Sequence, residues 1–125
     1  MKLSVIVAVY NEEKTIEKVL EKIENIKLQI EKEIIVIDDG STDNTSMILK
    51  QIFNSKKYLS FNIYHKILAN LGKASALRIG LALSSGDIIV TQDADLELEP
   101  SDLSVLLEPI LNEETEVVFG SRFLI

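Results

Sequence analysis

Runs of apolar, mostly β-branched residues without polar alternation constrain the fold of this 125-residue chain most strongly. The first run is LSVIVAV at residues 3–9. A strand with one face in water alternates apolar and polar residues, whereas a parallel strand covered on both faces is apolar throughout. Residues 33–39 (EIIVIDD) and 88–90 (IIV) have the same character. The sequence therefore predicts buried strands in a parallel sheet.

Two of the intervening segments have the periodicity of amphipathic helices. In the first, Asn11 is predicted to cap the amino terminus of the helix. Its apolar positions are Ile16, Val19, Leu20, Ile23 and Ile26. In the second, which follows a polar turn at residues 40–45, they are Ile48, Leu49, Ile52 and Phe53. We expect both helices to pack these positions on the sheet and to expose the others.

The remaining segments continue the alternation of strands and helices. Residues 61–65 predict a strand, and a helix opens at residues 70–73, with Gly86 as its C-cap. The side chains of this helix predicted to face the core are Ala74, Leu77, Ile79, Leu81 and Ala82. A helix from Pro100 and a last strand at residues 116–119 follow. This order predicts an α/β fold in one domain, residues 1–125, with a Rossmann-like, mostly parallel sheet and helices on both faces.

Composition narrows the classes of function. The net charge of −7 argues against a nucleic-acid-binding protein, which usually has a basic surface. The absence of cysteine excludes disulfides, thiolate nucleophiles and zinc sites built on cysteine. The apolar runs are too short to span a membrane, and no signal-peptide pattern is present. We therefore expect a cytoplasmic chain without a transmembrane segment.

The acidic segment after the strand at residues 88–90 predicts a metal site. Residues two apart in an extended segment point to the same side, so Asp93, Asp95 and Glu97 are expected to converge. Three uncompensated carboxylates repel one another unless a positive charge lies between them. A hard divalent cation that also carries a substrate phosphate is the simplest partner.

Polar residues after other strands extend this site, because ligands of open α/β sheets bind beyond the carboxyl ends of the strands. Asn11 and Glu12 follow the first strand, and Asp38 and Asp39 end the second. Lys73 opposes the dipole at a helix start, which makes it a candidate phosphate contact. Each residue also has a structural interpretation as a cap, a turn former or a solvated charge, so these patterns leave both interpretations open.

Five short motifs resemble the family 2 glycosyltransferases of GT-A fold. They are VAVYNE at residues 7–12, IDDGS at 37–41, NLGK at 70–73, DAD at 93–95 and GSR at 120–122. Their order and spacing match the family across essentially the whole chain. The DADL and GSRF forms are most similar to the dolichol- and polyprenyl-phosphate sugar synthases.

The resemblance implies an inverting transferase that uses a UDP- or GDP-linked sugar as donor and a polyprenyl phosphate, dolichyl phosphate or glycan as acceptor. Such an acceptor implies work at the cytoplasmic face of a membrane. The nucleotide-contacting residues implied by it are Ala8, Tyr10, Glu12, Asp39, Lys73, Asp93 and Ala94. The implied metal ligands, for Mg²⁺ or Mn²⁺, are Asp93, Asp95 and Glu97. Asp95, Lys73 and Arg122 are implied to stabilise the leaving diphosphate.

The chain departs from the family in two ways. Ala8 stands where the family usually has proline. Family catalytic domains also continue past the GSR motif, into the part that carries the acceptor site and usually the general base. The sequence is thus expected to be a nucleotide-binding half whose apolar end favours self-association. A non-catalytic nucleotide-binding or assembly half-domain is the first alternative.

Two other enzyme classes fit less well. A sugar nucleotidyltransferase would carry a glycine-rich loop with a basic end after its first strand, where this chain has Tyr10, Asn11, Glu12 and Glu13. A phosphotransferase of the haloacid dehalogenase type has its Asp-x-Asp after the first strand and not after the fourth. No convincing general base is visible in the sequence.

Overall fold

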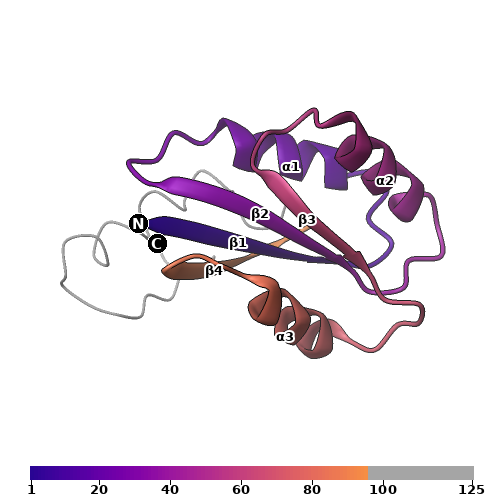
Figure 1. The fold of residues 1–125 in the computed structure, drawn as a ribbon. Coiled ribbons are helices and arrows are strands. Elements are labelled where there is room, and N and C mark those ends of the chain that lie inside the picture. The colour runs from indigo at the N-terminus through magenta and orange to yellow at the C-terminus, as the bar shows by residue number, and fades with distance from the viewer. Residues whose placement is uncertain (96–125) are drawn as a thin grey trace, which may run out of the picture.

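The computed structural model of the chain describes residues 1–95, in which strands and helices alternate (Figure 1). The elements are β1 (Lys2–Val9), α1 (Ile16–Asn25), β2 (Glu31–Asp38), α2 (Thr45–Ser55), β3 (Phe61–Lys66), α3 (Lys73–Leu83) and β4 (Ile88–Asp93). The predicted helix from Pro100 and the strand at residues 116–119 lie outside the described residues, as do Glu97 and Arg122. No helix in the described part of the chain has the length and apolar character needed to span a bilayer.

The strands form one parallel sheet in the order β3-β2-β1-β4. The α1 and α2 helices cover one face of the sheet and α3 covers the other (Figure 1). The α/β prediction with helices on both faces is therefore confirmed. From β1 the chain first adds strands on one side and then crosses to add β4 on the other. This reversal opens a crevice at the carboxyl ends of β1 and β4, the usual ligand site of such sheets.

The side chains of β1 explain why its sequence does not alternate. Leu3, Val5, Val7 and Val9 point into the core under α1 and α2, and all are at most 2% exposed. Ile6 points to the opposite face and packs in the second core, against residues that include Ile35, Ile37 and Ala76. Both faces of the central strands are dry, so apolar residues are required at nearly every position.

The prediction that Asn11 caps α1 is wrong. The helix begins at Ile16 with Thr15 at the N-cap position. Asn11 has a positive φ of 51°, and its side-chain oxygen accepts hydrogen bonds from the backbone amides of Thr42 (2.8 Å) and Asp43 (3.3 Å). Asn11 thus joins the loop after β1 to the loop after β2, a contact with residues far away in the sequence.

The predicted core face of α3 is also partly wrong. Ala74, Leu81 and Ala82 are exposed, whereas Ala76 and Gly80 are buried. A Cβ at position 80 would lie 2.5 Å from Cγ2 of Ile6, so the helix approaches β1 closely through its small residues. The helix ends at Leu83 with Ser84, and not Gly86, at its C-cap.

The β4 strand is less buried than predicted, since Ile89 is 41% exposed. Ile88 and Val90 pack against the core under α1 and α2. The α3 helix packs mainly on β1 and β2, which leaves the Ile89 side of β4 outside its cover. The expectation of a strand covered on both faces therefore holds for β1 and β2 but not for β4 in the described part of the chain.

Candidate functional site

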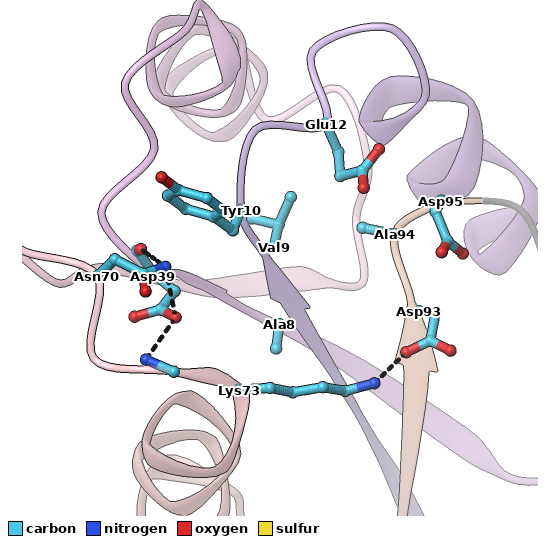
Figure 2. A pocket seen from close by; sticks show the side chains of 11 residues that line it. Ala8, Val9, Tyr10, Glu12, Asp39, Asn70, Lys73, Asp93, Ala94 and Asp95 are labelled. Carbon is cyan, nitrogen blue, oxygen red and sulfur yellow. Dashed lines mark hydrogen bonds and ion pairs between the residues drawn. The ribbon is translucent and has the colours of Figure 1, made fainter.

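An open pocket of about 340 Å³ lies at the carboxyl ends of the strands (Figure 2). Among its lining residues are all the predicted nucleotide and metal residues that lie within residues 1–95, namely Ala8, Tyr10, Glu12, Asp39, Lys73, Asp93, Ala94 and Asp95. The fold thus brings together residues from β1, β2, the start of α3 and β4. Their predicted roles toward ligands remain predictions.

The pocket also contains residues that the sequence did not single out: Val9, Asn70 and Gly72. Asn70 and Gly72 belong to the NLGK motif directly before α3, so their place beside Lys73 was the available signal. Gly72 has a φ of 102°, a backbone conformation that side-chain-bearing residues rarely adopt. Val9 is simply the last residue of β1, where the strand meets the pocket.

Asp39 shapes the pocket wall, because its buried carboxylate holds the loop before α3. One carboxylate oxygen accepts the backbone amide of Leu71 at 2.9 Å, and the other accepts that of Gly72 at 3.0 Å. The side-chain amide of Asn70 donates to the second oxygen at 3.2 Å. Figure 2 shows this carboxylate facing the Asn70 loop. Asp39 therefore positions the amino terminus of α3 whatever else it contacts.

Asp38 has a different task from its neighbour. Its side chain is fully buried, and its carboxylate accepts hydrogen bonds from the Ser41 backbone amide (2.9 Å) and from the Ser46 hydroxyl. These contacts shape the turn between β2 and α2. The turn-former interpretation therefore applies to Asp38, while Asp39 is the acid that reaches the pocket.

Lys73 and Asp93 form an ion pair across the pocket (Figure 2). The Lys73 Nζ lies 2.5 Å from Oδ1 of Asp93, and the two side chains are 62% and 29% exposed. The pair joins the first residue of α3 to the last residue of β4. A phosphate would compete with Asp93 for the ammonium group of this pair, and a metal ion would compete with Lys73 for the carboxylate.

The turn after β4 is held by the start of α1. The Thr15 hydroxyl donates to the backbone oxygen of Ala94 at 2.6 Å and lies 3.2 Å from Oε2 of Glu12. Because β4 ends at Asp93, Ala94 and Asp95 lie in a turn and not in an extended segment. Strand alternation is thus not what brings Asp93 and Asp95 to one pocket, and this part of the prediction is wrong.

The donor atoms fit a hard divalent cation that arrives with phosphate. Asp93 and Asp95 both line the pocket, and each has carboxylate oxygens to offer. Within residues 1–95, no three histidine, cysteine, aspartate or glutamate side chains are assembled closely enough to hold a metal. Mg²⁺ and Mn²⁺ sites commonly use one or two carboxylates and complete their shell with water and substrate phosphates. Asp93 and Asp95 are therefore ligands of the type that such a metal uses.

Comparison with known proteins identifies the family. The sequence model described as "Glycosyl transferase family 2" matches residues 4–125. The chain therefore belongs to glycosyl transferase family 2, which confirms the resemblance seen in its motifs.

Two curated relatives illustrate the kinship. An undecaprenyl-phosphate 4-deoxy-4-formamido-L-arabinose transferase of Proteus mirabilis is 36% identical over 123 residues, which cover 97% of this chain and 36% of the relative. A dolichol-phosphate mannosyltransferase of Pyrococcus furiosus is 33% identical, and the match covers 99% of this chain and 34% of the relative. The chain thus spans little more than a third of the length of these relatives.

Solved structures support the fold. S. aureus TarS in complex with UDP-GlcNAc superposes with a TM-score of 0.70 at 28% identity, over 91% of this chain and 32% of that one. The mannosyltransferase PcManGT of Pyrobaculum calidifontis, in complex with GDP-Man and Mn²⁺, gives a TM-score of 0.68 at 29% identity, over 86% and 32% of the two chains. The sheet and its helices are therefore those of GT-A glycosyltransferases.

Proposed function

We propose that this chain binds the donor of an inverting glycosyltransferase, a UDP- or GDP-linked sugar, together with Mg²⁺ or Mn²⁺. The observation that carries the proposal is that Asp39, Lys73, Asp93 and Asp95 line one pocket in a chain of family 2. The complexes of TarS with UDP-GlcNAc and of PcManGT with GDP-Man and Mn²⁺ support both the donor class and the metal.

In the proposed complex the base and ribose lie against Ala8, Tyr10, Glu12 and Asp39. The diphosphate lies toward Lys73 and the end of β4, where the ammonium group can donate charge-assisted hydrogen bonds to phosphate oxygens. Asp93 and Asp95 hold the metal, which when bound neutralises the charge that develops on the leaving diphosphate. Glu97 and Arg122 are assigned to the metal and to the phosphates from the sequence resemblance alone.

The proposed acceptor is a polyprenyl or dolichyl phosphate, at the cytoplasmic face of a membrane. The names of the Proteus and Pyrococcus relatives support this acceptor class. A phosphate oxygen is already anionic near neutral pH, so it attacks the sugar without a general base. A hydroxyl acceptor would require such a base.

Calorimetric titration of the chain with UDP and with GDP, each with and without Mn²⁺, tests donor binding. We expect one of the two nucleotides to bind, and to bind more tightly with Mn²⁺. The Asp93→Asn and Asp95→Asn variants should lose the Mn²⁺ dependence, whereas Glu21→Asn, an exposed change on α1 away from the pocket, should keep it. Failure of both nucleotides to bind would refute the proposal.

A turnover assay separates a transferase from a binding module. Labelled UDP-glucose or GDP-mannose is incubated with a polyprenyl phosphate, and transfer to lipid is measured. Nucleotide binding without transfer would favour a donor-binding module that acts with other protein segments.

A further inference from the structure

The cation proposed for this site and the ammonium group of Lys73 require the same carboxylate. Lys73 Nζ lies 2.5 Å from Oδ1 of Asp93, and Asp93 is one of the two described acids assigned to the metal. Resting on the proposed function, we propose that Lys73 competes with the metal for Asp93 and moves to the donor diphosphate when metal and nucleotide bind. The pocket then binds cation and diphosphate as a pair and discriminates against a bare cation.

The geometry makes the competition direct. A metal held by Asp93 would use the same carboxylate to which Lys73 Nζ now donates at 2.5 Å. Two positive charges on one oxygen repel each other strongly at such separations. Metal binding at Asp93 and the Lys73 ion pair therefore disfavour each other.

The cost of moving Lys73 is small, because the ion pair is exposed. The Lys73 side chain is 62% exposed, and exposed ion pairs contribute little to stability. The backbone of the residue before it is fixed, since Asp39 accepts the Gly72 amide at 3.0 Å. The side chain can therefore change partner while the start of α3 stays in place.

The new partner follows from the charge at the start of α3. This 11-residue helix has no acidic residue in its first turn, and Lys73 adds a positive charge to the positive end of the helix dipole. A diphosphate has several oxygens, which can interact with the Lys73 ammonium group and with the amino terminus of α3 at the same time. A single chloride ion or water molecule cannot do this. The diphosphate thus gives Lys73 a better partner at the moment when the metal takes Asp93, so each ligand strengthens the binding of the other.

The decisive measurement is the affinity for Mn²⁺ alone, by calorimetry or by the Mn²⁺ resonance signal, on Lys73→Met. The matched control is Lys50→Met, which removes the same charge from an exposed position of α2 that does not line the pocket. We expect Lys73→Met to bind Mn²⁺ roughly three- to tenfold more tightly than Lys50→Met, as removal of a nearby like charge predicts. Equal or weaker binding, or no detectable binding by either variant, would overturn the proposal.

A double-mutant cycle locates the effect on Asp93. In an Asp93→Asn background the remaining Mn²⁺ binding at Asp95 is weaker and is titrated at higher Mn²⁺ concentrations. There Lys73→Met should change the affinity no more than Lys50→Met does, because the contested carboxylate is gone. A gain that persists in this background would mean a general field effect and would overturn the competition. Thermal melts of the four proteins check that each is folded.

The nucleotide titrations test the transfer of Lys73 to phosphate. With saturating Mn²⁺, Lys73→Met should bind UDP or GDP roughly tenfold or more weakly, the loss typical of a charged hydrogen bond, and Lys73→Arg should recover part of it. The same substitution thus changes the two affinities in opposite directions. If wild type binds neither nucleotide, the proposed function fails. If wild type binds one and Lys73→Met does not bind Mn²⁺ more tightly, the competition alone fails.

Discussion

The carboxylate of Asp39 accepts the backbone amide of Gly72, 33 residues later, at 3.0 Å. The same carboxylate accepts the amide of Leu71 at 2.9 Å. Together these bonds attach the end of β2 to the loop from which α3 and Lys73 begin. The position of Lys73 in the pocket therefore depends on the hydrogen bonds of Asp39, a residue that is only 3% exposed.

Replacing Asp39 with asparagine should loosen this loop. An amide group offers only one accepting oxygen, so one of the two backbone amides loses its partner, at a cost of about 1–3 kcal/mol in unfolding free energy. Urea denaturation measures the loss, and nucleotide titration should show weaker binding. Asp87→Asn is the control, because Asp87 is an exposed acid that also accepts a backbone amide, that of Lys2. Equal losses in both variants would contradict a special role for Asp39.

Gly40 is required by close backbone contact as well as by its φ of +75°. A Cβ at this position would lie 2.6 Å from the carbonyl carbon of Ala69. Gly72 also has a positive φ, of +102°, but a Cβ there would have no neighbour within 4 Å. With ψ at 157°, Gly72 lies in a backbone region essentially restricted to glycine, so Gly72→Ala should show backbone strain of about 1–3 kcal/mol and no steric clash. Gly40→Ala should add overpacking of about 1–3 kcal/mol to its own backbone strain. Comparable denaturation midpoints for the two variants would argue against the close contact.

Thr15 is expected to support the acidic turn after β4. Its hydroxyl donates to the Ala94 carbonyl at 2.6 Å, next to Asp95. Thr15→Val removes this bond with little change of shape, and we expect a cost of about 1 kcal/mol and weaker binding of Mn²⁺ with nucleotide. Thr91→Val, at an exposed position of β4, is the matched control and should leave both quantities nearly unchanged. Unaltered binding by Thr15→Val would show that the turn is held by other contacts.

Glu33 makes the stability of the fold depend on pH, and it lies near the amino-terminal end of β2, away from the pocket. Burial acts to raise the pKa of this carboxyl group, but hydrogen bonds from Ser4, Ser85 and Lys2 outweigh it and hold the pKa below the ordinary value of 4.5. The Ser4 hydroxyl donates at 2.6 Å and the Ser85 amide at 2.8 Å. The ionised group therefore stabilises the fold above about pH 4.5, and this contribution is lost as the pH falls through the lowered pKa.

Glu33→Gln should remove that acid-dependent contribution. Near pH 7 we expect the variant to be less stable by about 1.5–3 kcal/mol, the range for hydrogen bonds to a charged group. Its unfolding free energy should then fall less steeply than that of wild type below pH 4.5. Glu31→Gln, an exposed position at the start of β2, is the control. Parallel pH profiles for wild type and Glu33→Gln would refute the assignment.

The strands and the position of the site were predictable because burial leaves a direct record in local sequence. The run through Val5, Ile6 and Val7 is apolar at every step, since these side chains point alternately into two dry cores. Acids at the carboxyl ends of parallel strands necessarily meet at one edge of the sheet. Asp39 and Asp93 could therefore be placed at the same end of the sheet without knowledge of the coordinates.

The face of α3 was not predictable in the same way. Apolar residues are distributed around nearly the whole circumference of this helix, so their periodicity does not show which face meets the sheet. The close approach to the sheet is made at Gly80, where a Cβ would lie 2.5 Å from Cγ2 of Ile6, and Ala76 is buried in the same core. Asn11 was misassigned for a related reason, because its partners Thr42 and Asp43 are distant in sequence.

Local sequence patterns thus specify which segments become strands, which charged residues follow these strands and to which family the chain belongs. The pairing of Lys73 with Asp93, and of Asp39 with the start of α3, depends instead on the strand order β3-β2-β1-β4. That order sets the distance between side chains on different segments, and a hydrogen bond or ion pair forms only when that distance is about 3 Å. Periodicity along one segment contains no information about this distance. The competition proposed for Asp93 could therefore be inferred only from the tertiary structure.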